Sequence, residues 1–308
     1  MRREEKRTAL AYGGIISVIL IWAVIPIFKK FFIGDYFSAS VYSAISAFSS
    51  FFALLIINRK ALSSLNREYF KVAVPTGLCV GAAVLAQALA YNFNASPTNQ
   101  AFLENLSCLI VPVILFVMTK RKPSALTVIA SIVCLTSSMV LSGIFSVGAR
   151  FSAADILNVL AGIFYGVNIA FTGIYAKKFK AALYVMIQLF VQGVLSAIMA
   201  VAFNFIQIGG SVIDPFVFTP NILTILGVMV IGVISNALCW TVRTSAMKHV
   251  SASVVAIIMP FSAVITAVIA VLSGQDRATP SLLIGAGLGI AAGLISALGD
   301  IKERESRG

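Results

Sequence analysis

The sequence predicts an all-α integral membrane protein with ten transmembrane helices, arranged as two inverted five-helix repeats. Hydrophobic residues make up 59% of the 308 residues and charged residues only 11%, and the apolar residues gather in ten runs. A soluble domain usually has about 25% charged residues. A single core cannot hide this much apolar side chain. The composition therefore excludes a soluble enzyme, a disordered chain and a secreted disulfide scaffold.

Each apolar run is long enough to cross a bilayer as a helix. A helical span needs roughly 20 apolar residues, and a helix satisfies its own backbone polar groups within the hydrocarbon. The first run follows a basic N-terminus but precedes no small-residue cleavage site, so we expect a retained span rather than a signal peptide. The ten predicted spans are residues 9–32, 37–58, 71–93, 98–119, 124–146, 154–177, 181–207, 220–246, 250–273 and 279–300.

The distribution of Lys and Arg predicts the orientation of these spans. Cytoplasmic loops of membrane proteins carry an excess of both residues. With the N-terminus in the cytoplasm, 19 of the 23 Lys and Arg fall on that side, and the exceptions are Lys29, Lys30, Arg150 and Arg277. We therefore expect a plasma (inner) membrane protein with both termini cytoplasmic. The net charge of +12 is spread over six cytoplasmic segments, so no nucleic-acid partner is expected.

The two halves of the chain, residues 1–148 and 149–308, resemble each other in the order of their motifs. Residues 99–103 align with residues 251–255, for example, at the start of a span in each half. Five spans are an odd number, so the second half must cross the membrane in the opposite direction. Inverted repeats are typical of secondary transporters, whose substrate site lies near the bilayer midplane between the repeats.

Several short segments of the sequence are similar to those of a known protein family. They are Ile21-Trp22-Ala23 with Lys29, the entry to the fourth span at residues 95–103, the segment 244–252, and the glycine run of the last span. With these segments the chain resembles the drug/metabolite transporter superfamily and, within it, the EamA-type ten-helix carriers. The resemblance covers nearly the whole chain. It implies transport of a small metabolite through a central cavity, with the fifth helix of each half at the periphery.

Polar residues inside the spans are the candidates for substrate binding or coupling. Such residues are costly in a membrane and should face protein or a water-filled cavity. At helical spacing they fall on single faces of several spans, whereas spans 5 and 10 have no such face, which predicts a cavity walled by spans 1–4 and 6–9. The alternative is that they only form hydrogen bonds between helices. The candidates are Glu104, Trp22, Gln87, Tyr91, Tyr165, Asn168, Gln188, Gln192, Asn236, Trp240 and Arg243.

Two of these candidates are charged. Glu104 is the only acidic residue well inside a predicted span, and a carboxylate there must be paired, hydrated or protonated. We therefore expect a proton-coupling group or the counter-ion of a cationic substrate, and the alternative is an ion pair with Lys29 or Lys30. Arg243 lies near the cytoplasmic end of the eighth span. It is either an interfacial charge or a ligand for an anionic substrate.

The sequence favours a secondary active transporter that works by alternating access on a small-molecule substrate. It has one histidine, no phosphate-binding loop and no His-Glu-x-x-His, so we expect neither an enzyme nor a cofactor or metal site. Because amino-acid export is common in the resembled family, we expect export of amino acids or related compounds. The alternatives are uptake of a quaternary amine or nucleobase-like metabolite, and a non-transport accessory protein. The glycine run Gly285, Gly289 and Gly293 permits a homodimer.

Overall fold

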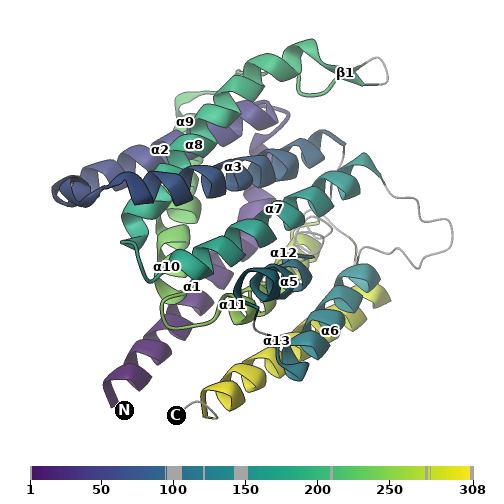
Figure 1. Cartoon of the computed structure of the whole chain (residues 1–308). Coiled ribbons are helices and arrows are strands. Elements are labelled where there is room, and N and C mark those ends of the chain that lie inside the picture. The colour runs from purple at the N-terminus through teal and green to yellow at the C-terminus, as the bar shows by residue number, and fades with distance from the viewer. Residues whose placement is uncertain are drawn as a thin grey trace.

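The computed structural model describes residues 2–93, 95, 106–120, 122–141, 152–208, 211–274, 277 and 279–305. This part of the chain is almost entirely helical (Figure 1). Outside the helices it contains one short antiparallel pair, β1 (Gln207–Ile208) with β2 (Ser211–Val212), in the connection between two helices. The predicted all-helical membrane class is therefore confirmed, apart from this small hairpin.

The helices follow the predicted spans closely. In the first half they are α1 (Arg2–Phe32), α2 (Ala39–Ile57), η1 (Arg59–Ser64), α3 (Arg67–Leu89), η2 (Ala90–Phe93), α5 (Ser107–Thr119) and α6 (Ala125–Leu141). In the second half they are α7 (Ala153–Tyr175), α8 (Ala181–Ala202), η4 (Phe203–Phe205), α9 (Ile222–Gly232), the π-helical η5 (Val233–Leu238), α10 (Cys239–Ala246), α11 (Ala252–Ile258), α12 (Phe261–Leu272) and α13 (Pro280–Glu305).

Seven helical segments in the described part of the chain are long and apolar enough to cross a membrane, and three apolar helices are shorter. Each of these segments overlaps one predicted span. The shorter ones are residues 107–119, 125–140 and 280–296. These findings support a multi-pass membrane protein, whereas the count of ten spans and the inverted repeat stay predictions.

Local sequence explains where several helices begin and bend. The Asn66 side chain accepts hydrogen bonds from two backbone N–H groups at the start of α3, and Ser152 with Asp155 forms a reciprocal capping box at the start of α7. Pro26 lies within α1, and Pro260 separates α11 from α12. Proline removes a backbone donor and so interrupts the helical hydrogen bonds. Pro75 and Pro112 also lie within α3 and α5, so prolines interrupt the hydrogen bonds of several helices of the bundle.

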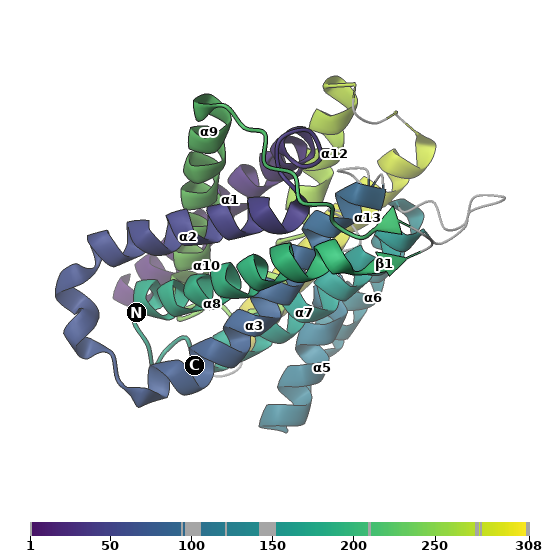
Figure 2. The same cartoon turned by 90° about the horizontal axis from the view of Figure 1, so that it is seen from above.

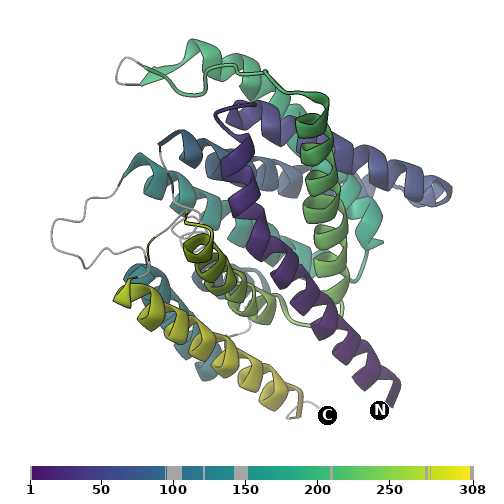
Figure 3. The same ribbon diagram turned by 180° about the vertical axis from the view of Figure 1, so that it is seen from behind.

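The helices pack as a bundle in which α6 and α13 form a pair at one edge (Figures 1 and 3). On the other side, α8 packs against both α2 and α3 (Figure 2). The start of α1 and the end of α13 lie at the same end of the molecule (Figure 1). The central part of the bundle therefore lies between the α6–α13 pair and the layer of α2, α3 and α8.

The glycine run of α13 is used inside the chain. A Cβ atom placed on Gly293 would clash with the Phe261 ring of α12, and one on Gly289 would lie 3.2 Å from the Ser137 Oγ of α6. The Ser137 hydroxyl also donates a hydrogen bond of 2.6 Å to the Gly285 carbonyl. Gly285, Gly289 and Gly293 therefore pack against α6 and α12 within the chain, and the possible homodimer stays a prediction.

Candidate functional site

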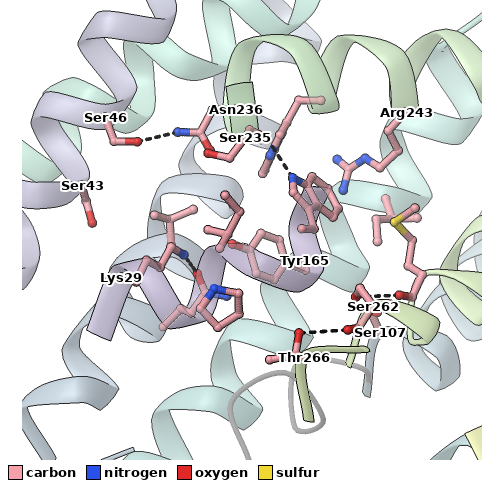
Figure 4. A pocket seen from close by; sticks show the side chains of 18 of the residues that line it. Lys29, Ser43, Ser46, Ser107, Tyr165, Ser235, Asn236, Arg243, Ser262 and Thr266 are labelled. Carbon is pink, nitrogen blue, oxygen red and sulfur yellow. Dashed lines mark hydrogen bonds between the residues drawn. The ribbon is translucent and has the colours of Figure 1, made fainter. Parts of the chain in front are cut away.

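A cavity of about 110 Å³ lies in the centre of the bundle (Figure 4). Such a volume holds several water molecules or a small ligand group. Its walls come from α1, α2, α3, α5, α7, η5, α10, α12 and the break between α11 and α12, and no described residue of α6, α8 or α13 contributes to them. Six of the predicted site residues line it: Trp22, Gln87, Tyr165, Asn236, Trp240 and Arg243.

Two further predicted residues lie directly behind the cavity wall. The Tyr91 hydroxyl donates a hydrogen bond of 2.8 Å to the carbonyl of Pro26, which lines the cavity. Asn168 is fully buried on α7, and its Oδ1 accepts a hydrogen bond of 3.0 Å from Nη2 of Arg243. Both residues therefore support the lining rather than form it.

The predicted contribution of the seventh span to the cavity wall is wrong. Gln188 of α8 donates from Nε2 to the Thr76 Oγ1 of α3 at 2.9 Å. Gln192, also on α8, is fully buried, and its amide atoms have no hydrogen-bond partner among the described residues. The backbone of Gln192 lies close to Gly81 of α3. The polar face of α8 therefore meets α3 rather than the cavity, because α8 is packed between α2 and α3.

Glu104, the predicted coupling residue, lies outside the described residues. Its role therefore stays a prediction from the sequence.

Arg243 is the central charge of the cavity wall. It is 2% exposed, so the alternative of an interfacial charge is wrong. Its guanidinium carbon lies 4.6 Å from the centroid of the Trp240 ring and 5.5 Å from that of Trp22, within the range of cation–π attraction. Among the described residues its side chain makes one hydrogen bond, to Asn168, and its buried Nε has no partner. Among the described residues that line the cavity, none is a carboxylate.

A buried chain of hydrogen bonds extends from Arg243 into the bundle. Asn168 Nδ2 donates to the Thr76 carbonyl at 3.3 Å, and the Thr76 hydroxyl lies 2.8 Å from the Tyr184 hydroxyl. The Tyr184 hydroxyl in turn lies 3.4 Å from the Thr172 hydroxyl. These contacts connect α10 through α7 and α3 to α8, so the position of the guanidinium depends on three other helices.

Lys29 lies on the opposite side of the cavity from Arg243 (Figure 4). Its ammonium group donates to the Gln87 amide oxygen of α3. Lys29 follows Trp22 by seven residues, which is about 10 Å along α1. Between the two ends, Asn236 Nδ2 donates to the Ser46 hydroxyl at 2.8 Å. The cavity therefore has two cationic ends with hydroxyl and amide groups between them.

The π-helical segment η5 positions the middle of the cavity. The indole N–H of Trp22 donates to the Ser235 carbonyl at 2.9 Å, and Asn236 belongs to the same segment. A Cβ on Gly232 would lie 2.7 Å from the Ser46 hydroxyl, so only glycine allows this approach of the helix to α2. π-Helical turns occur frequently at functional sites. Here the turn brings α1, α2 and the eighth span together.

The cavity lining also contains a group of hydroxyl residues that were not predicted from the sequence. A usable signal was the spacing of Ser43 and Ser46, three residues apart on one helical face of α2. The hydroxyl and phenol residues that were not predicted as site residues are Tyr42, Ser43, Ser46, Ser107, Ser235, Ser262 and Thr266.

A second cavity, of about 520 Å³, lies further along the same helices. Its wall includes Gly173 and Met247, each one helical turn beyond a residue of the first cavity, Ile169 and Arg243 respectively. A single buried apolar cluster includes Ile169 of the first cavity and Met247 of the second. The described basic residues in the second lining are Lys122, Lys177, Lys248 and His249, and no acidic residue is found among the described lining residues.

A multi-pass helical membrane protein with a polar central cavity is the class that this fold and site define. Residues 152–298 match the model of the EamA-like transporter family. The second half of the chain therefore carries an EamA-like transporter family domain, which belongs to the drug/metabolite transporter superfamily, and the predicted resemblance is confirmed over these residues.

A comparison with solved structures supports the overall fold. One crystal structure of a protein superimposes with a TM-score of 0.73 over 95% of this chain and 99% of its own length, at 14% identity. At this identity the similarity establishes the fold alone. The comparison with curated proteins gave no match.

Proposed function

We propose that this protein is a secondary transporter that moves a small metabolite across the plasma membrane by alternating access, exporting amino acids or related compounds. The observation that carries this proposal is the central cavity. Six of the polar or aromatic residues that stand out in an otherwise apolar sequence line this one space. Polar groups at such a position within membrane helices mark a substrate or ion pathway.

The two cavities, which both have lining residues on α5 and α7, support alternating access. They follow each other along the same helices, and a buried apolar cluster contacts both. With the termini in the cytoplasm, as the charge bias predicts, Lys29 belongs to the outer end of the first cavity. The second cavity then opens on the cytoplasmic side. A rearrangement of the apolar cluster would open the central cavity to that side.

The lining also bears on the choice of substrate. Its hydroxyl and amide groups can hydrogen-bond a small polar metabolite, and its apolar residues can hold a side chain. Amino acids meet both requirements. The second candidate is uptake of a quaternary amine, because the rings of Trp22, Tyr165 and Trp240 line the cavity and aromatic faces attract such cations.

The test uses purified protein in vesicles loaded with a mixture of labelled amino acids. We expect the protein to release label faster than empty vesicles do, and to exchange it against unlabelled amino acid on the other side. If Glu104 couples transport to protons, a pH gradient speeds release by wild type. The Glu104→Gln variant is expected to lose this effect of pH and to keep the exchange.

The outcomes separate the parts of the proposal. Vesicles that release no amino acid but accumulate labelled choline favour the quaternary-amine alternative. A Glu104→Gln protein that still responds fully to the pH gradient contradicts the coupling role. Glu68, at the start of α3, is the matched control. It lies outside the cavity lining, and Glu68→Gln should behave as wild type.

A further inference from the structure

We infer that Arg243 binds an ionised carboxylate group of the ligand that enters the central cavity. The inference rests on the proposed function in one respect only, because it takes this cavity as the substrate site. It goes beyond that proposal by assigning a charge to the substrate and a residue to that charge.

The hydrogen-bonding state of Arg243 is the first reason. A guanidinium group has five N–H donors, and burial of such a cation is costly unless charge and hydrogen bonds compensate for it. Here the described residues supply a single acceptor, Oδ1 of Asn168, and the buried Nε has none. A carboxylate supplies the missing negative charge together with two acceptor oxygens that match the planar guanidinium fork.

The two indole rings are the second reason. The guanidinium carbon of Arg243 lies 5.5 Å from the ring centroid of Trp22 and 4.6 Å from that of Trp240. These contacts stabilise the cation in the absence of a ligand. A quaternary amine bound at the same rings would have to approach Arg243, which repels it. The geometry therefore favours a negatively charged ligand group over the positively charged group of the alternative function.

The second cavity gives a third, independent reason. Lys122, Lys177 and Lys248 contribute to its lining, none of the described lining residues is acidic, and Met247 in its wall directly follows α10, the helix that carries Arg243. Clefts lined by charges of one sign raise the local concentration of ligands of the opposite sign. Both cavities therefore favour the same sign of ligand charge.

The two tryptophans make this site directly observable. Trp22 and Trp240 are the only tryptophans of the chain, and both contact the Arg243 guanidinium. Intrinsic tryptophan fluorescence of the purified full-length protein therefore reports binding next to Arg243. The probes are the amino acids without fluorescent side chains and straight-chain carboxylates of two to six carbons, each paired with its primary amide. Choline and uracil represent the alternative substrates, and ionic strength is held constant.

We expect at least one acid to change the fluorescence in a saturable manner, and its amide to bind at least tenfold more weakly. Arg243→Gln should weaken binding of that acid at least tenfold, and Arg243→Lys, which keeps the charge, should weaken it less. The comparison of acid with amide on wild type needs no variant, so it decides the question even if Arg243→Gln does not fold.

Three results overturn the inference: equal binding of acid and amide, unchanged affinity of a folded Arg243→Gln protein, or a panel in which no acid changes the fluorescence. Failure of the proposed function has a different signature. A protein that binds acids through Arg243 in detergent but moves none across vesicles contradicts transport alone. A protein that transports choline without inhibition by any acid contradicts the carboxylate inference alone.

Discussion

The helices α7 and α8 carry similar stripes of polar residues but use them differently. On α7, Tyr165 lines the cavity and Asn168 holds the guanidinium of Arg243. On α8, Tyr184 and Gln188 hydrogen-bond to Thr76 of α3 and do not reach the cavity. Regular spacing of polar residues therefore identifies a helix face that meets protein. The packing partners of the helix decide whether that face meets a cavity or another helix.

Among substitutions on α7 and α8, the largest effect is expected at Asn168 of α7. Asn168→Leu removes the only described acceptor of Arg243, and a hydrogen bond to a charged group contributes about 1.5–3 kcal/mol. We expect affinity for the acid to fall about tenfold, since 1.4 kcal/mol corresponds to a factor of ten. Titration of the tryptophan fluorescence measures this loss.

Asn158 offers a matched control on the same helix. It is also fully buried, but its amide atoms have no partner among the described residues and it does not line the cavity. Asn158→Leu should leave the affinity within twofold of wild type. If the two variants lose affinity equally, the effect belongs to α7 as a whole and not to the Arg243 contact.

A smaller effect, of opposite sign, is expected at Gln192 of α8. Its amide is buried without a partner among the described residues, and an unsatisfied buried polar group costs about 1–3 kcal/mol. Gln192→Leu should therefore raise the free energy of unfolding and the apparent Tm by a few degrees. Thermal unfolding of the purified variant measures the change, and a lower Tm would show that this amide is hydrogen-bonded in the membrane.

The smallest effect is expected at Gln188. Gln188→Met keeps the length of the side chain but removes its hydrogen bond to Thr76, and such interhelical bonds contribute about 0.6 kcal/mol on average. We expect a slightly lower Tm and unchanged fluorescence titrations. A loss of affinity as large as that of Asn168→Leu would place α8 in the binding site after all.

The sequence alone predicted the most conspicuous parts of the site. Arg243 and the two tryptophans stand out because a charge or a large amphipathic ring in an apolar helix needs a specific environment. The membrane class follows from the composition in the same way. The central cavity has no described lining residue on α6 or α13, which agrees with the lack of polar stripes on spans 5 and 10.

The small hydroxyl residues of the site could not be found in this way. Serine costs little in a membrane helix because its hydroxyl can bond its own backbone, as Ser43 does with the Ala39 carbonyl at 2.9 Å. Its presence therefore says little about a cavity.

Asp214, which lies outside the cavity lining, is a structural residue that was missed for a different reason. It lies in a loop, yet it is buried and accepts hydrogen bonds from the backbone N–H groups of Ala39 and Ser40 at the start of α2. A contact between residues so distant in sequence leaves no local pattern.

The π-helical turn η5 also fixes the direction in which the following helix points its side chains. One residue of an α-helix corresponds to about 100° of rotation around the axis, since a turn holds 3.6 residues. Trp240 and Arg243 lie in α10, the helix that directly follows η5. If this segment returned to regular α-helix by losing one residue, both side chains would turn away from the cavity while keeping their neighbours in the sequence. Whether the cavity holds a positive charge at this position thus depends on the π-helical conformation of the six residues Val233–Leu238 as much as on the presence of Arg243.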